Sequence, residues 1–347
     1  MIGILDQIEI DADKLSAMQQ LLSERYVPGA IARGMKLTRS WVSPPLALIN
    51  EPMTLWVLWE VEHVGSWWNM RMRAAADPSV PAFWADADKL CKKRDRHYLV
   101  DTAPAADAEP LPAPVPLGTE RLTTENGVRV TAQFFVRKNA SAQDIAQWEQ
   151  ALRAAPQHIA GLQQVFLARN LEGSFGAGDY TADLHFIDAA AQQAATQQAY
   201  WRDTLQPLFD RVVEREWRMA TQLIGGGMRS PNIKNGIKRT AYFRMFPGVA
   251  KDIAANWERT TLEMPAYMAT MKNWSLSRAL DDHWTYVWEQ EFERVDDLLG
   301  EYMIHPHHWA YVDPWFDHEF KKRVIANELS HAFCPTASSV LAWSLSK

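Results

Sequence analysis

The chain opens with alternating apolar and polar residues and then changes to helical spacing. Residues 3–10 alternate with a period of two, which predicts a strand. Residues 12–26 show helical spacing, and Pro28–Gly29 ends the predicted helix. Strands over 35–42 and 53–61, a helix over 67–90 and a strand over 97–100 follow. This β-α-β-β-α-β order is the ferredoxin-like pattern.

The last third of the chain predicts the same order of elements. Strands are expected over 238–246, 274–280 and 283–292, with helices over 249–271 and 295–304. His305–Pro306 breaks the second helix and starts a new turn, because proline suits the first position of a helix. A last strand is expected within 327–343.

The middle and last thirds match each other at an offset of 109 residues. Trp148–Glu149 then falls on Trp257–Glu258, and Pro156 falls on Pro265. The gapless match continues through Leu162 and Met271 to Leu171 and Leu280. A fixed offset over so many positions indicates an internal repeat.

Two segments divide the chain into three repeats. Five prolines among alanines between 101 and 120 predict an extended connector, and Gly225–Gly227 with the following Pro231 predicts a second break. We therefore expect repeats over 1–105, 121–226 and 238–347, joined by linkers over 106–120 and 227–237. Each repeat has the size of a small domain.

The predicted fold class is α+β, with three tandem ferredoxin-like repeats that form barrels of the dimeric type. One such repeat covers only one face of its sheet with helices, so the other face needs a partner sheet. We expect two repeats to form a barrel with an apolar lumen within the chain. The third repeat would then form a homodimer with a second chain.

Composition and charge argue against a nucleic-acid-binding, membrane-spanning or disulfide-rich protein. The net charge of −6 makes nucleic acid an unexpected partner, and no apolar run is long enough for a membrane span. The first residues read as a strand rather than a signal peptide, and Cys91 and Cys334 cannot form a disulfide scaffold. We therefore expect a cytoplasmic protein. The 16 tryptophans fit either an aromatic core or an apolar pocket for an aromatic ligand.

Three runs of residues resemble one superfamily. The run Lys238–Gly248 resembles the first strand of the stress-responsive dimeric α/β-barrel proteins, and Tyr302–His308 resembles their Y-x-x-H-P-x-H signature. EthD-type barrel proteins share the H-P-x-H part. The first repeat is similar to a NIPSNAP-like domain of the same superfamily, through Gly34–Leu37, Leu55–Trp56, Arg71, Arg73 and Asp77–Pro78.

The resemblance implies a small-molecule enzyme or a protein without catalytic activity. The superfamily holds cofactor-free cyclases, monooxygenases and lyases that act on phenolic substrates, and also haem enzymes. The Tyr302–His308 segment is similar to that of olivetolic acid cyclase, in which a tyrosine and a histidine at this spacing are catalytic. The other pocket histidines of that enzyme would fall on Arg239 and Tyr286, so the cyclase reaction is not carried over intact.

Three residues are the candidate catalytic groups. His308 could act as a general base, because histidine exchanges a proton near neutral pH, and Tyr302 could orient a carbonyl or phenolate oxygen. His305 is a further candidate. The structural alternative is that His305 caps the helix at Pro306 and that His308 closes the mouth of the barrel by packing.

Strand alternation predicts the residues that bind substrate. Arg239 is expected to face the lumen with Ala241 and Phe243, and a buried arginine needs an anion. That anion could be a substrate carboxylate or a protein carboxylate such as Glu289 or Glu291. An aromatic wall of Trp284, Tyr286 and Trp288 would complete the pocket, with core packing as the alternative, and Arg71 and Arg73 are expected in solvent.

We therefore predict a cofactor-independent lyase, decarboxylase or cyclase acting on a small hydrophobic aromatic compound. The first alternative is a haem enzyme with His305 or His308 as axial ligand, because aldoxime dehydratases carry a similar S-H-P-x-H segment. The second is a binding or assembly module, in which side chains would fill the lumen and Arg239 would be paired internally. No metal ion or nucleotide cofactor is expected, since nucleotide-binding motifs are absent from the sequence.

Overall fold

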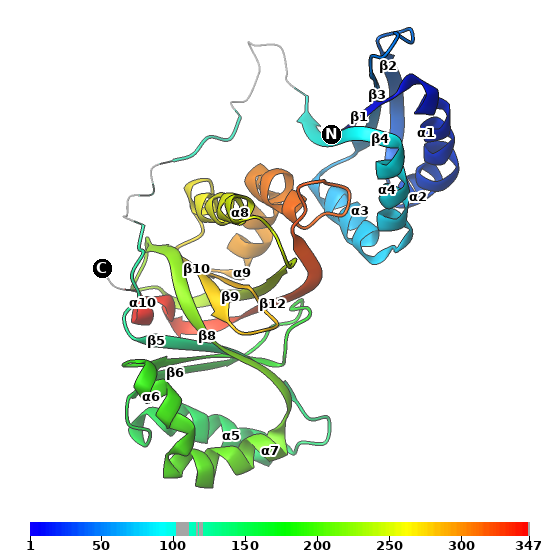
Figure 1. The fold of residues 1–347 in the computed structure, drawn as a ribbon. Helices are drawn as coiled ribbons and strands as arrows, with labels where there is room; N and C mark the ends of the chain where they lie inside the picture. The colour runs from blue at the N-terminus through cyan, green and yellow to red at the C-terminus, as the bar shows by residue number, and fades with distance from the viewer. Residues whose placement is uncertain (102–110, 116, 118–120, 346–347) are drawn as a thin grey trace. The chain divides into compact units, whose positions relative to one another are not determined.

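A computed structural model describes residues 1–101, 111–115, 117 and 121–345 (Figure 1). Most of the predicted linker over 106–120 lies outside the described residues. The chain forms two compact units. The first contains Met1–Ala113 and Ile304–Asn327, and the second contains Pro114–Met303 and Glu328–Lys347. No helix among the described residues is long and apolar enough to cross a membrane.

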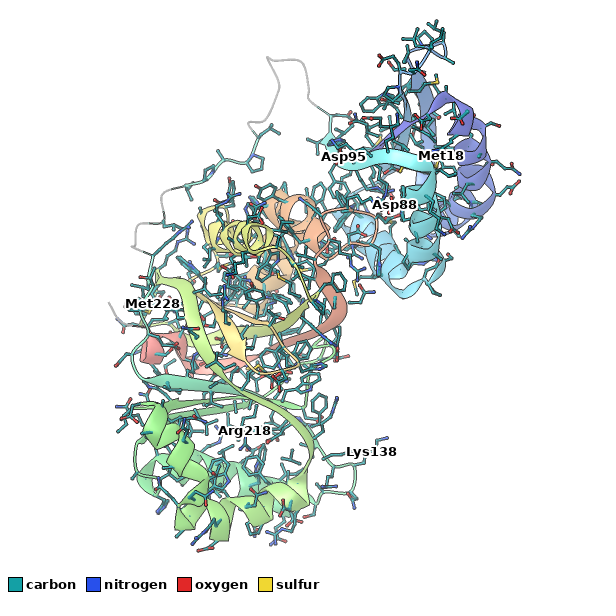
Figure 2. All side chains as sticks on the ribbon, viewed as in Figure 1. Met18, Asp88, Asp95, Lys138, Arg218 and Met228 are labelled. Carbon is teal, nitrogen blue, oxygen red and sulfur yellow. The ribbon has the colours of Figure 1, made fainter. Side chains whose placement is uncertain are left out.

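The first unit is a four-stranded antiparallel sheet with helices on one face. Its strands lie in the order β2-β3-β1-β4, with β1 at Ile2–Ile10, β2 at Lys36–Ser43, β3 at Met53–Val61 and β4 at Cys91–Val100. The helical elements are η1 (Ala12–Lys14), α1 (Leu15–Leu21), η2 (Leu22–Tyr26), α2 (Val27–Ala32), α3 (Val64–Ala76) and α4 (Ser79–Leu90). Alternate residues of β1 such as Ile4 and Ile8 belong to one hydrophobic core with Trp67 and with Met18, which is labelled in Figure 2.

Residues 304–327 belong to the first unit, although the sequence places them in the third repeat. They include η8 (His307–Val312) and η9 (Asp313–Trp315). Trp309 lies in the hydrophobic core of the first unit. Charged contacts reinforce this packing, because Arg96 of β4 pairs with Glu319 at 2.5 Å.

The second unit contains the second and third repeats in one eight-stranded sheet, in the order β12-β9-β11-β10-β8-β5-β7-β6. The second repeat comprises β5 (Val128–Val136), α5 (Ala142–Ala154), η3 (Ala155–Gln157), β6 (Leu162–Arg169), β7 (Tyr180–Phe186), α6 (Ala189–Ala194), η4 (Ala195–Gln197), η5 (Trp201–Leu205), α7 (Gln206–Val212) and β8 (Val213–Met228). The third comprises β9 (Lys234–Met245), α8 (Lys251–Glu263), η6 (Met264–Ala266), β10 (Asn273–Leu280), β11 (Tyr286–Phe292), α9 (Val295–Asp297), η7 (Leu298–Tyr302), β12 (Ile325–Ser338) and α10 (Leu341–Ser344), apart from residues 304–327.

The offset of 109 residues is confirmed as a structural repeat. Helix α5 maps onto α8, and η3 maps onto η6. Trp148 and Trp257 occupy the same helical position and are both fully buried. Pro156 and Pro265 both stand second in the short helix that follows, where the missing N–H of proline costs no hydrogen bond.

The predicted break at Gly225–Gly227 is wrong, because these residues lie inside β8. This strand has 16 residues, and its end pairs with β10 of the third repeat. A Cβ atom on Gly227 would lie 2.3 Å from the Trp274 ring. Gly227 therefore makes room for the Trp274 ring, and Gly226 for the backbone of β10, rather than forming a hinge.

The eight-stranded sheet curls so that its two edges are joined by hydrogen bonds. Its edge strand β12 is joined to the loop after β6, where the N–H of Leu171 donates to Phe333 O at 2.9 Å and Phe175 bridges to His331. Across the inner face, Ser330 of β12 donates to Gln133 of β5 at 2.6 Å. The two repeats therefore form a barrel-like pair, with their helices on the outer face of the sheet.

Candidate functional site

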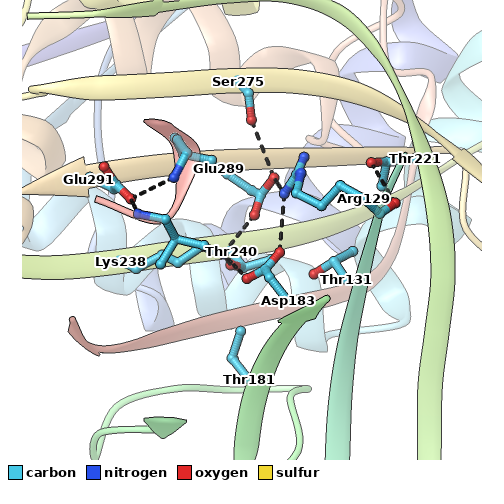
Figure 3. A network of polar contacts seen from close by, with 12 residues as sticks. Arg129, Thr131, Thr181, Asp183, Thr221, Lys238, Thr240, Ser275, Glu289 and Glu291 are labelled. Atoms are coloured by element: carbon cyan, nitrogen blue, oxygen red, sulfur yellow. Dashed lines mark hydrogen bonds and ion pairs between the residues drawn. The ribbon is translucent and has the colours of Figure 1, made fainter. Parts of the chain in front are cut away.

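A ring of four buried charges occupies the inner face of the second unit (Figure 3). Arg129 of β5 and Lys238 of β9 are the cations, and Asp183 of β7 and Glu289 of β11 are the anions. Lys238 Nζ donates to Glu289 at 2.6 Å and lies 2.9 Å from Asp183. Arg129 contacts the same two carboxylates. We call these four residues the ion ring.

The charges of the ion ring act on one another, and Glu125 adds a further carboxylate 3.5 Å from Arg129. Burial, with Glu289 nearby, raises the pKa of Asp183. Burial alone would raise the pKa of Glu289, but the charges of Arg129 and Lys238 lower it to about 2. Thr240 accepts the remaining hydrogen bond of the Lys238 ammonium at 2.7 Å, and Ser275 donates to Glu289 at 3.2 Å. The expectation of an apolar lumen is therefore wrong at this level of the barrel.

Arg239 lies on the helix-covered face of the sheet, so the prediction that it faces the lumen is wrong. In β9 the inward positions are Lys238, Thr240 and Tyr242, and Phe243 contacts Trp257 of α8 on the outer side. The pairing of β9 with β11 places Arg239 beside Gln290 and Thr240 beside Glu289. Arg239 therefore shares a face with Gln290, and the ion ring lies on the opposite face. Lys238, and not Arg239, is the residue that pairs with Glu289.

The Arg239 guanidinium is buried, with 5% of the residue exposed. It donates to Gln290 Oε1 at 2.6 Å and to His331 Nδ1 at 3.3 Å, and it lies 5.1 Å from the centre of the Tyr302 ring. Within the part of the chain that the structure describes, no carboxylate forms an ion pair with it. Burial lowers the pKa of Arg239, opposed only by Tyr302. We call Arg239, Gln290, Tyr302 and His331 the Arg239 site.

Tyr302 contributes a protonated phenol to this site. It comes from η7 and is buried. Burial raises the pKa of its hydroxyl, while Arg239 and hydrogen bonds with Gln290 and Trp288 act in the opposite direction. The structure thus brings together Tyr302, Arg239 and Trp288, three residues that the sequence marks as candidates.

His331 was not marked by the sequence. It lies in β12, and its ring contacts Phe175 at 4.6 Å and Phe243 at 6.0 Å between centroids. A guanidinium can only donate, so His331 Nδ1 accepts from Arg239 and the neutral ring carries its proton on Nε2. A lone histidine in a predicted strand gives no signal of such a role.

The expected aromatic wall is divided between two faces of the sheet. On the helix side, Tyr286 packs at a tilt on Trp257 with 4.4 Å between ring centroids and donates to Glu258 at 2.7 Å, and Trp288 is buried on that side. Trp284 precedes β11 and packs at 4.9 Å on Trp217 of β8, in the cluster that contains Tyr242 on the inner side. The three residues therefore do not form one wall.

The predicted histidines belong to the first unit, whereas Tyr302 belongs to the second. His305 Nδ1 accepts from the N–H of His307 at 3.1 Å, as in the predicted capping alternative. His308 packs on Trp68 at 5.1 Å. Burial lowers the pKa of His307 to about 4. The roles of His305 and His308 in catalysis stay predictions.

Arg71 is buried, so the prediction of a solvated side chain is wrong for it. It lies 2.8 Å from Asp313 and 3.3 Å from Asp317, two buried carboxylates of the 304–327 segment. Burial raises the pKa of Asp317 to about 6, with Arg71 opposing. Arg73 is exposed, as predicted. Among the described residues, no cluster of three or more His, Cys, Asp or Glu side chains could hold a metal ion.

Comparison with known proteins gives structural likenesses only. No protein-family model and no curated protein matches the chain. An anthrone oxidase-like protein is 9% identical with a TM-score of 0.47, over 62% of this chain and 94% of its own. A proposed monooxygenase from Fusobacterium nucleatum is 13% identical with a TM-score of 0.43, over 61% and 92%. A NIPSNAP domain protein from Burkholderia xenovorans is 21% identical with a TM-score of 0.25, over 32% and 100%.

Proposed function

We propose that the chain is a cofactor-independent acid/base enzyme of the lyase type, acting on a small hydrophobic aromatic anion at the Arg239 site. One observation carries the proposal. A guanidinium that is 5% exposed has no carboxylate partner among the described residues. Burying an unpaired charge is costly, so a substrate carboxylate or phenolate is the natural counter-ion.

The chemistry of the site suits an anion. Arg239 carries a positive charge, Tyr302 keeps its phenolic proton, and His331 carries a proton on Nε2. Hydrogen-bond donors stabilise negative charge that develops on a substrate oxygen. Arg239 would hold the anion, Tyr302 would donate its phenolic proton to the atom that becomes negative, and neutral His331 would donate a hydrogen bond from Nε2. Solvent would return that proton after the product leaves.

The surroundings of the site suit an aromatic ring. Phe243 and Phe175 contact His331, and Trp288 hydrogen-bonds to Tyr302. These rings offer apolar area beside the buried cation. The proposal keeps a tyrosine and a histidine at the site, but the histidine is His331, acting as a hydrogen-bond donor, in place of His308 as a general base. The free thiols of Cys91 and Cys334 fit the proposed location in the cytoplasm.

A titration with phenolic acids tests the binding step. Tryptophan fluorescence of the full chain should change saturably with 4-hydroxybenzoate, because Trp288 adjoins the site. Arg239→Gln should weaken binding at least tenfold, since it removes the charge that pairs with the carboxylate. Arg244→Gln is the matched control, because Arg244 lies on the same strand with its side chain 46% exposed. Equal affinity of both variants would contradict the proposal.

A second candidate function is a binding or assembly module without catalysis. The ion ring favours it, because side chains occupy the inner face of the barrel where a substrate was expected. Such a module would bind no phenolic acid at Arg239 and would show no turnover with any member of the class. The titration therefore separates it from the enzyme.

The haem alternative has its own test. Haemin is added to the purified protein, and the Soret band is followed through the titration. The proposed cofactor-independent enzyme predicts no saturable uptake. Stoichiometric uptake that is lost in His305→Ala or His308→Ala would replace the proposal by a haem enzyme with that histidine as axial ligand.

A further inference from the structure

The segment that joins η7 to β12 has a counterpart in the second repeat. Pro314–Asp317 repeats the pattern of Pro207–Asp210, as P-W-F-D against P-L-F-D. In both places the proline stands in the first turn of a short helix, η9 or α7, and a π-helical turn, η8 or η5, precedes that helix. Residues 304–327 of the third repeat are therefore the sequence counterpart of η5 and α7.

The two counterparts lie in different hydrophobic cores. Trp201 of η5 and Phe209 of α7 belong to the core of the second repeat, which is their own. Trp309 of η8 belongs to the core of the first unit, where its ring centroid lies 5.5 Å from that of Trp67 on α3. The third repeat therefore gives its counterpart of α7 to the first unit. We call residues 304–327 the exchanged segment.

Buried charges hold the exchanged segment in the first unit. Arg71 of α3 lies 2.8 Å from Asp313 and 3.3 Å from Asp317. Arg96 of β4 lies 2.5 Å from Glu319, and all five side chains are buried. Loss of one partner would leave an uncompensated charge in a low-dielectric interior. These ion pairs therefore oppose any other position of the segment.

Both ends of the exchanged segment lead to the Arg239 site. Tyr302 stands two residues before the segment begins. Strand β12 begins inside the segment at Ile325 and contains His331, which accepts from Arg239 at 3.3 Å. Side chains that must be ordered when a ligand binds lose conformational freedom, and this entropic cost weakens binding. A segment that is already fixed removes that cost for the residues at its ends.

We propose that Arg71 is a positioning residue for the Arg239 site. By holding the exchanged segment through its two buried carboxylate partners, it keeps Tyr302 and His331 ordered for an aromatic anion. The first repeat is then a working part of the enzyme and not only an attached module. This inference rests on the proposed function, since it assumes that the anion binds at the Arg239 site.

Binding of 4-hydroxybenzoate to the full chain tests the role of Arg71. In the fluorescence titration, Arg71→Gln should raise the dissociation constant about tenfold, because the exchanged segment loses the cation that two carboxylates share. Arg73→Gln is the matched control, since Arg73 is exposed on the same helix, and it should leave the dissociation constant unchanged. Arg71→Lys keeps the charge and should recover most of the lost affinity.

The outcomes separate the positioning role from the proposed function. Absence of saturable binding by the wild-type chain would overturn both. Saturable binding with equal dissociation constants for the wild type and an Arg71→Gln variant with native circular dichroism would overturn only the positioning role. A loss of affinity that Arg71→Lys does not reverse would mark a general disturbance of the fold and would overturn the positioning role as well.

Hydrogen exchange of the wild-type chain tests the same coupling without any substitution. Coupling between two sites is reciprocal, so a ligand that needs an ordered segment must also stabilise that segment. Saturating 4-hydroxybenzoate should slow amide exchange in η8 and η9 by about threefold or more, while exchange in α1 of the same unit should stay unchanged. Equal protection of α1 and η8, or no protection of η8 with the ligand bound, would overturn the positioning role.

Discussion

Two carboxylates share one guanidinium in the first unit. Asp313 and Asp317 both face Arg71 and are buried. Asp317 also interacts electrostatically with Glu319, Tyr98 and Arg323. One cation cannot fully compensate two anions in a low-dielectric environment, so burial keeps a proton on this pair at mildly acidic pH.

The proton on Asp317 predicts a pH-dependent stability. The folded pKa of about 6 lies above the ordinary value of 3.8, so the folded state binds more protons than the unfolded state between these values. The contribution of Asp317 to the free energy of unfolding is therefore present at low pH and falls as the pH rises toward 6. Relative to Asp317→Asn, the wild type should lose about 2 kcal/mol between pH 4 and 7. Urea unfolding of both chains at several pH values measures this difference, and a difference that is flat or grows with pH would contradict it.

At the residue scale, the sequence predicts the chemistry of the site better than its geometry. Arg239 and Tyr302 can be marked from the sequence, and the structure brings them together. The face on which Arg239 lies could not be predicted, because alternation gives two faces but the pairing with β11 decides which one is inside. His331 comes from a distant strand, so no local pattern connects it with Arg239.

The elements themselves follow from the periodicity of the chain. The order of strands and helices in each repeat and the offset between the last two repeats are visible in the sequence. The sequence does not show that residues 304–327 pack in the first unit. Their ion-pair partners Arg71 and Arg96 lie more than 200 residues earlier in the chain, so no local pattern connects them. The break predicted at Gly225–Gly227 is absent, because the packing of the Trp274 ring on Gly227 leaves no local signal in the sequence.

A substitution in β8 tests whether Gly227 is needed to leave room for the Trp274 ring. Gly227→Ala should destabilise the chain by about 1–3 kcal/mol, because the new Cβ would meet the Trp274 ring, which is buried and cannot move away easily. Gly300→Ala is the control, since a Cβ at that position meets no atom within 4 Å. It should be neutral or slightly stabilising. Thermal unfolding of both variants gives the comparison, and equal effects would contradict the packing argument.

At the scale of the whole molecule, the ion ring connects two repeats. Arg129 and Asp183 come from the second repeat, and Lys238 and Glu289 come from the third, so each repeat supplies one cation and one anion. Buried charges stabilise only when they are balanced. The ion ring therefore determines which repeats pair with each other more than it stabilises either repeat alone.

Removal of one member tests this balance. Glu289→Gln leaves Lys238 with Asp183 as its only carboxylate in the ion ring, and Arg129 with Asp183 and Glu125, which should cost about 3–5 kcal/mol in the free energy of unfolding. The double variant Glu289→Gln with Lys238→Met removes one cation together with one anion, so the net charge of the cluster is kept. It should therefore cost much less than the sum of the two single variants. Additive costs in urea unfolding would show that the four charges do not act as one unit.

The most direct test of the proposed function is a crystal structure of the full chain with 4-hydroxybenzoate. The Arg239 site predicts the carboxylate within hydrogen-bond distance of the Arg239 guanidinium, with the ring beside Phe243 and Tyr302 or His331 donating to an oxygen of the ligand. A ligand bound elsewhere, with Arg239 still held by Gln290 and His331 as in the free chain, would contradict the assignment of the site.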